Sequence, residues 1–174
     1  LFGLSSLAFA QNSVSSDIHI AKGKKVSRNV STVSGDVFVG SGARIKGGVT
    51  AVSGDIEIGS KAFVQNVEVV SGNISVGKGA SAVQLETVSG DVHLYEKSSV
   101  SSAIETVSGD VNCDSGSDIS ENIMTVSGDI ELDDSRLRGN LKTVSGDISL
   151  FNGSMIDGDI IINRKSNAVL FHDG

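Results

Sequence analysis

The sequence predicts an all-β fold, a single-stranded parallel β-helix of about eight coils. The first observation is a tetrapeptide, Val-Ser-Gly-Asp, that returns at steps of 18 or 19 residues, starting at Val33, Val52, Val88, Val107, Val126 and Val144. At Val70 it ends in Asn, and at Val14 it is the degenerate Val-Ser-Ser-Asp. The second observation is that apolar positions fall into columns when these coils are aligned. Such short, regular repeats are typical of solenoids.

Within a coil, apolar and polar residues alternate after the repeated valine. Val88, Val92 and Leu94 would then face one side, and Ser89, Asp91 and His93 the other, as in a strand with one buried face. We therefore expect five inward columns. The first holds the repeat valines from Val14 to Val144, and the others run from Ile18 to Ile148, from Ile20 to Leu150, from Val26 to Ile156 and from Val30 to Ile160. The fourth column would include Phe63 and Ser81.

Three small-residue columns accompany the apolar ones. A glycine column from Gly35 to Gly146, assigned to the inward side, indicates a bend where no side chain fits. A serine column from Ser15 to Ser145 lies next to it, with a partial threonine column at Thr32, Thr87, Thr106, Thr125 and Thr143. We interpret both as a hydroxyl ladder on the strand face, and an ice-binding array is the alternative.

The expected shape is a thin rod. Parallel strands stack at about 4.8 Å, so eight coils give a length on the order of 38 Å. Parallel crossovers favour a right-handed coil. The absence of Trp and the 4% aromatic content fit a core built from Val, Ile and Leu.

Charge and hydropathy restrict the partners. The net charge of −7 argues against nucleic acid and anionic membrane surfaces as ligands. No apolar run reaches the roughly 18 residues of a transmembrane helix. We expect a protein or an envelope component as the partner, with end-to-end self-association as a further option.

The first ten residues predict the location. They form an apolar segment that ends in Ala8-Phe9-Ala10, which matches the end of a secretory signal peptide. We therefore divide the chain into a signal-peptide remnant at 1–10, a solenoid domain at 11–162 and a tail at 163–174 that could cap the last coil. The expected location is the periplasm, the cell surface or the medium.

The aspartate column is the first candidate for chemistry. Calcium bound between coils would use Asp36, Asp55, Asp91, Asp110, Asp129 and Asp147. One carboxylate per coil falls short of the six to eight oxygens that calcium takes. The alternative is that each side chain hydrogen-bonds to turn backbone.

No other polar group suggests catalysis. His19 and His93 share an outward column but lie four coils apart, which predicts surface residues rather than a metal site. Cys113 falls in an inward column and reads as a small buried hydrophobe. The coils carry no insertion that could wall a cleft, so we expect no enzyme activity and no cofactor.

The repeat also resembles known families. Thr125 to Ile130 and Thr143 to Ile148 resemble the T-V-S-G-D-[VI] units of bacterial domains of unknown function that are classed as adhesin-like. That resemblance covers nearly all of residues 14 to 162 and implies an extracytoplasmic β-solenoid. More distantly, Ile156 to Ile160 resembles the coils of bactofilins, polymer-forming scaffold proteins that are mostly cytoplasmic.

Three hypotheses follow. The first is an adhesin-like scaffold that presents a regular rod face to a partner. The second is a self-assembling filament of the bactofilin kind. The third is a calcium-dependent or ice-binding module.

Overall fold

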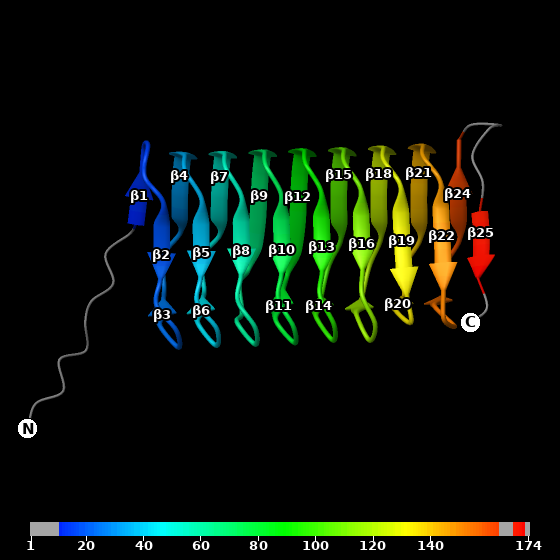
Figure 1. Cartoon of the computed structure of the whole chain (residues 1–174), viewed down its shortest axis with the longest axis horizontal. Helices are drawn as coiled ribbons and strands as arrows, with labels where there is room; N and C mark the ends of the chain where they lie inside the picture. The colour runs from blue at the N-terminus through cyan, green and yellow to red at the C-terminus, as the bar shows by residue number, and fades with distance from the viewer. Residues whose placement is uncertain (1–10, 164–168, 173–174) are drawn as a thin grey trace, which may run out of the picture.

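The computed structural model describes residues 11–163 and 169–172 and confirms the parallel β-solenoid. Figure 1 shows its coils side by side along one axis. Within the described residues every strand pairing is parallel, and no helix is present. The predicted leader, residues 1–10, lies outside the described residues.

Three sheets form the walls of the solenoid. Sheet A contains β1 (Gln11–Ser13), β4 (Val30–Ser34), β7 (Val49–Ser53), β9 (Asn66–Ser71), β12 (Gln84–Ser89), β15 (Ile104–Ser108), β18 (Ile123–Ser127), β21 (Leu141–Ser145) and β24 (Ile160–Ile162). Sheet B contains β2 (Ile18–Ile20), β5 (Val37–Val39), β8 (Ile56–Ile58), β10 (Ile74–Val76), β13 (Val92–Leu94), β16 (Val111–Cys113), β19 (Ile130–Asp133), β22 (Ile148–Phe151) and β25 (Val169–His172).

The third wall, sheet C, is built from two-residue strands. It contains β3 (Lys25–Val26) and β6 (Arg44–Ile45), and then β11 (Ser81–Ala82), β14 (Ser99–Val100), β17 (Asp118–Ile119), β20 (Arg136–Leu137) and β23 (Met155–Ile156). Single bridges at Phe63 join the two groups. In Figure 1 the strands of sheet B run down the near side and those of sheet A run up the far side as the chain advances, so the coil is right-handed.

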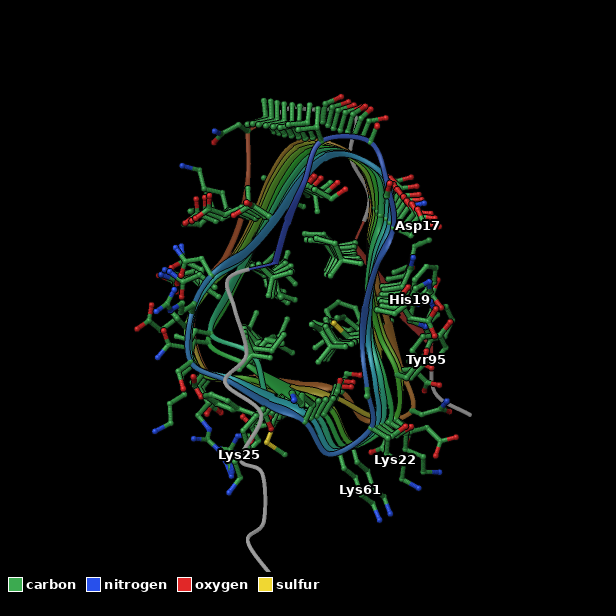
Figure 2. All side chains as sticks on the ribbon, turned by 90° about the vertical axis from the view of Figure 1, so that its left-hand side faces the viewer. Asp17, His19, Lys22, Lys25, Lys61 and Tyr95 are labelled. Carbon is green, nitrogen blue, oxygen red and sulfur yellow. The ribbon has the colours of Figure 1, made fainter. Side chains whose placement is uncertain are left out.

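The register of sheet A repeats the spacing of the sequence. Leu85 pairs with Ile104, Thr87 with Thr106, and Ser89 with Ser108, each 19 residues apart. Val88 and Val107 therefore lie on neighbouring parallel strands at the same height. Figure 2, which looks along the axis, shows the side chains superposed in columns.

Four of the five predicted apolar columns face the interior. Those that begin at Ile18, Ile20 and Val30 are buried through every coil up to Ile148, Leu150 and Leu141 respectively. Each coil contributes only a few inward side chains, so neighbouring coils supply the rest of the contact surface. Together these columns form one continuous apolar core.

The first predicted column, the repeat valines, is wrong: these residues face the solvent. Val88 is 50% exposed, whereas the preceding Thr87 is 4% exposed and points inward. The reason is the corner at Gly90, whose φ of +144° turns the chain between β12 and β13. Alternation holds on each side of such a corner but not across it, so the valine does not share the face of Val92.

An inward column of mostly threonines replaces the valines. It consists of Thr32, Ala51, Val69, Thr87, Thr106, Thr125 and Thr143, all buried. The hydroxyls of Thr32, Thr106, Thr125 and Thr143 have no hydrogen-bond partner. The predicted surface ladder of threonines is thus wrong, and the flat Thr/Ser array that an ice-binding face needs is missing from the described surface.

The fourth column is correct except at two coils. Phe63 bridges to Arg44 and to Ser81 on the outer face, and Val64 and Ala82 take the inward positions. The coils that begin at Val52 and Val70 have 18 residues, one fewer than a 19-residue coil. In both, the chain is shorter after the fourth column, not before it, so the inward residue comes one position later than the sequence alignment predicts. Ser81, predicted as the one polar side chain of the inward columns, therefore does not face the core.

The glycine column marks the bend that the sequence predicts, but its free side faces along the axis rather than inward. A Cβ on Gly90 would lie 2.0 Å from the carbonyl oxygen of Gly72 in the previous coil. Each coil thus stacks its Ser-Gly-Asp corner directly on the corner below, at a distance that only glycine permits.

The segment Val169–His172 lies in the predicted tail and forms strand β25. It pairs in parallel with Ile148–Phe151 and adds one more strand to sheet B. The residues between it and β24, 164–168, lie outside the described part of the chain.

Candidate binding face on sheet A

An exposed apolar stripe runs along the corner of sheet A. It is formed by the repeat valines, whose exposed fraction is 44% at Val52 and 51% at Val33, and 49% at Val70 and Val107. Because the coils stack in register, these side chains follow one line parallel to the rod axis. We call this line the valine stripe, and it comprises the exposed Val33, Val52, Val70, Val88, Val107 and Val126 and, at its end, the half-buried Val144.

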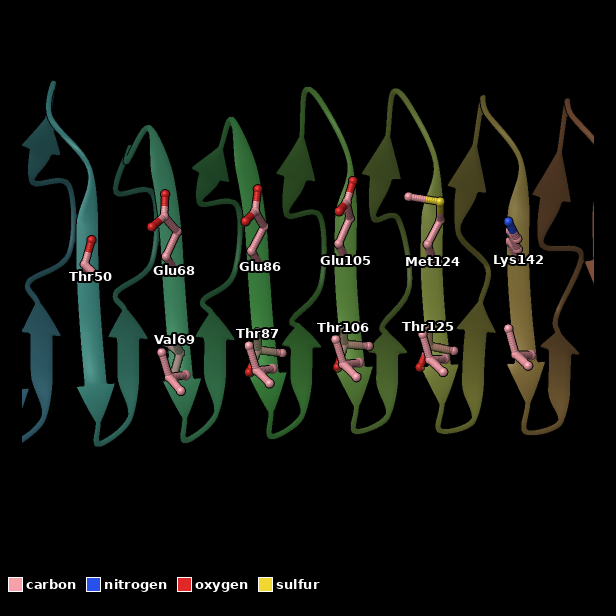
Figure 3. Close-up of a pocket in the computed structure, with 15 residues that line it drawn as sticks. Thr50, Glu68, Val69, Glu86, Thr87, Glu105, Thr106, Met124, Thr125 and Lys142 are labelled. Carbon is pink, nitrogen blue, oxygen red and sulfur yellow. The ribbon is translucent and has the colours of Figure 1, made fainter.

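A second outward line lies two residues earlier on each strand. It reads Thr50, Glu68, Glu86, Glu105, Met124 and Lys142, and strand pairing places each residue directly beside the next. Figure 3 shows these side chains in one row across successive strands. We call the three carboxylates Glu68, Glu86 and Glu105 the acidic row.

A groove of about 460 Å³ lies between the valine stripe and this second line. It extends from Thr50 to Lys142 on one side and from Val70 to Val144 on the other. Two residues along a strand separate the lines by about 6.6 Å. One wall of the groove is therefore apolar, and the other changes from acidic to basic along the axis.

In the acidic row, three like charges lie side by side. Partial burial raises the pKa of Glu86, and the charges of Glu105 and Glu68 raise it further. The Gln84 amide donates a hydrogen bond of 2.5 Å to Glu86. None of the ion pairs found among the described residues involves the acidic row.

The aspartate candidates for calcium form a hydrogen-bond ladder instead. Oδ1 of Asp36 accepts a 2.8 Å bond from the backbone amide of Asp55, and Asp91 accepts one of 2.8 Å from Asp110. In the same way, Oδ1 of Asp110 accepts a hydrogen bond from the backbone amide of Asp129, and Oδ1 of Asp129 accepts one from the backbone amide of Asp147. Asn73 takes the same role toward Asp91. An amide thus serves where a carboxylate does, so this contact needs no charge.

The described residues contain no group of three or more His, Cys, Asp or Glu side chains that could hold a metal ion. The aspartate side chains point outward at their corner, as Figure 2 shows for Asp17. Oδ1 of each of five candidates accepts a hydrogen bond from a backbone amide of the next coil; they are Asp36, Asp55, Asp91, Asp110 and Asp129.

The two histidines lie on the outer row of sheet B and do not meet. His19 stacks on Phe38, with 4.7 Å between ring centroids, and His93 stacks on Tyr95 at 4.2 Å. Nε2 of His93 also lies 3.0 Å from Oδ1 of Asp114. Cys113 is buried as predicted, and burial raises the pKa of its thiol.

Sequence reasoning missed the acidic row. Its signal was present, because the three glutamates recur at the repeat spacing of 18 and 19 residues, two positions before a repeat valine. Because the valines were predicted to face the core, nothing in the sequence indicated that these glutamates lie beside an apolar line on the surface. The groove appears only once both lines are placed on the same outer face.

Comparison with known protein families gives one match. The model of one family, described as Toastrack DUF4097, matches residues 64–170, more than half of the chain. No curated protein and no solved structure matches. In the part of the chain that the structure describes, no helix has the length and apolarity needed to cross a membrane.

Proposed function

Since this chain belongs to the Toastrack DUF4097 family, a family of unknown function, we propose that it acts as a non-catalytic, adhesin-like rod that presents the outer face of sheet A to a partner. The observation that carries the proposal is the valine stripe, which exposes an apolar side chain at the same height in each coil from Val33 to Val126. Isolated surface hydrophobics are ordinary, but a continuous exposed line of them is typical of an interaction site.

The uniform coils support a binding role rather than catalysis. Every coil has 18 or 19 residues, so no long loop rises beside the groove to enclose a substrate. The groove is an open channel on a rigid sheet, and such a surface suits a partner that lies along it.

The proposed location is outside the cytoplasm, in the periplasm or at the cell surface. The support is the apolar segment that ends in Ala8-Phe9-Ala10, with the pattern of a signal-peptide cleavage site. The net charge of −7 suits a soluble rod that does not adhere to anionic surfaces.

A photo-crosslinking amino acid at single positions tests the proposal in cells that produce the protein. At Val107, on the valine stripe, we expect a crosslinked adduct with another molecule. Glu131, on the outer face of sheet B, is the matched control. Equal labelling at the two positions, or none at Val107, would show that sheet A is not the binding face.

A self-assembling filament is the second candidate function, and the C-terminal coil favours it. Met155, Leu170 and Phe171 are 55%, 44% and 70% exposed there. Within residues 11–163 and 169–172, strands β23, β24 and β25 each pair on one side only, and unpaired strand edges invite further strands. Filaments that lengthen with concentration in electron micrographs would support this candidate, and a monodisperse rod would exclude it.

A further inference from the structure

We propose that the groove on sheet A binds a basic amphipathic α-helix that lies along the rod axis. This inference rests on the proposed function and specifies the partner of the same face. Its basis is the juxtaposition of the acidic row and the valine stripe on the two sides of one groove.

The charge of the partner follows from the acidic row. Three carboxylates lie side by side at about 4.8 Å, and like charges at this spacing repel each other. Partial burial first, and then the charges of Glu105 and Glu68, raise the pKa of Glu86. Lysine or arginine side chains placed above the row would remove the repulsion and form ion pairs at its three positions.

The partner must dock through side chains rather than through backbone hydrogen bonds. Strands β7, β9, β12, β15, β18 and β21 line the groove, and each pairs with a neighbour on both sides. No free strand edge is therefore available for an added β-strand along the groove. A helix satisfies its own backbone and presents only side chains, which is the usual occupant of such a groove.

The dimensions also fit a helix. From Val70 to Val144 the stripe crosses four strand steps, or about 19 Å, which corresponds to about 13 helical residues at 1.5 Å each. One helical turn advances 5.4 Å, close to the spacing of the coils. The two lines, about 6.6 Å apart, match neighbouring i, i+3 and i+4 positions on one helix face.

The second line also gives the groove a direction. Beyond the acidic row it continues through Met124 to Lys142, so its charge changes sign along the axis. A helix that carries basic residues, then an apolar residue and then an acidic residue matches this line in one orientation only. In that orientation its basic residues lie beside the acidic row and its acidic residue lies beside Lys142. The reverse orientation would place a cation against Lys142.

Binding of a synthetic 18-residue helical peptide tests the inference with the full chain; the peptide carries a leucine line beside a line of lysines that ends in an apolar and then an acidic residue. We expect fluorescence anisotropy to show binding and circular dichroism to show a gain of helix. A peptide of the same composition with the two lines scrambled should bind at least ten times more weakly, because it cannot engage both sides of the groove at once.

Matched variants locate the site. E86Q/E105Q should weaken peptide binding at least tenfold and reduce its salt dependence, and E57Q/E131Q, with the same charge change on sheet B, should not. V88T/V107T/V126T should weaken binding, and V33T/V52T, on the stripe beyond the groove, should not. These residues are at the surface, so the variants keep their fold.

Several outcomes would overturn the inference. The first two are equal peptide binding by E86Q/E105Q and the wild type, and equal binding of the scrambled peptide. The other two are burial of the groove in a dimer of the chain itself, and binding to vesicles of anionic lipid that E86Q/E105Q leaves unchanged. A specific adduct at Val107 with no binding of the lysine–leucine peptide would reject the helix but keep the proposed function. Loss of the adduct would reject the proposed function itself.

Discussion

The backbone amide of Asp129 donates a 2.8 Å hydrogen bond to Oδ1 of Asp110, which occupies the same corner one coil earlier. The contact repeats from coil to coil and ties neighbouring corners together. It also explains a column of stacked aspartates without a metal ion. Each side chain accepts a hydrogen bond from a backbone amide that the strand pairing does not use.

The first prediction concerns this ladder. Replacement of Asp110 by Ala leaves the amide of Asp129 without its acceptor, and we expect a loss of about 1 kcal/mol in the free energy of unfolding. Asp110→Asn should retain the stability, since Asn73 makes the same contact in its own coil. Urea denaturation measures both variants. Equal loss in the two would mean that charge, not hydrogen bonding, matters at this corner.

The second prediction compares a glycine that is both closely packed and at positive φ with one that is only at positive φ. Gly90→Ala should destabilise the protein by about 3 kcal/mol, because its Cβ would lie 2.0 Å from the carbonyl oxygen of Gly72 and its φ of +144° disfavours a side chain. Gly42→Ala is the control, with φ of +68° and no atom within 4 Å of the added Cβ. Lys61 and Lys97 adopt similar φ values of 57° and 58° at the equivalent corner.

For Gly42→Ala we expect a cost of about 1 kcal/mol, from the positive φ alone. Thermal unfolding followed by circular dichroism compares the two variants. A similar cost at both positions would contradict the tight stacking of the Ser-Gly-Asp corners.

The repeat length and the period-two alternation were sufficient to predict the solenoid, its coil number and its parallel register. They could not predict the faces across a corner. Val88 and Val92 have matching parity in the sequence, yet Gly90 turns the chain between them and Val88 emerges on the surface. Likewise, the sequence does not show where an 18-residue coil loses its residue, and so Phe63 was assigned to the core in place of Val64.

The candidate site depended on those same faces. Once the valines are outside, the acidic row gains an apolar neighbour and the groove becomes visible. Alternation along one strand is a local property, whereas the relation between two strands of a coil depends on the turn that joins them. For this reason the columns of sheet B were predicted correctly, and the outer face of sheet A was not.

The third prediction concerns the buried threonines. The hydroxyl of Thr125 is buried without a hydrogen-bond partner, which carries a desolvation cost that valine would not have. Thr125→Val should therefore stabilise the protein by about 1 kcal/mol, and Val69 already occupies this column. Thr125→Ser keeps the hydroxyl, loses a methyl group and should destabilise. Chemical denaturation that ranks the serine variant above the valine variant would contradict the burial of this column.

The fourth prediction is a pH dependence at the acidic row. The pKa of Glu86 is raised in the folded protein by partial burial and by Glu105 and Glu68, so the folded state holds its proton more tightly than the unfolded state. Stability from this group is full below the unfolded pKa of about 4.5 and is lost as the pH rises through the raised value. Glu86→Gln removes that loss.

We therefore expect Glu86→Gln to be more stable than the wild type at pH 7, by less than about 1 kcal/mol because solvent screens the row. The difference should vanish near pH 4. Denaturation curves at the two pH values measure it, with Glu131→Gln as the control. A Glu86→Gln variant that is less stable than the wild type at pH 7 would reverse the sign that we assign to the row.

The last prediction concerns Cys113, which lies in the third apolar column between Leu94 and Leu132. Burial raises the pKa of its thiol, and the thiolate is the reactive form. We expect no reaction with a thiol reagent in the native protein and one equivalent of reaction after unfolding in denaturant. Cys113→Val should keep the stability within about 1 kcal/mol, because valine suits the same column. Rapid labelling of the native thiol would show that the interior opens at this coil.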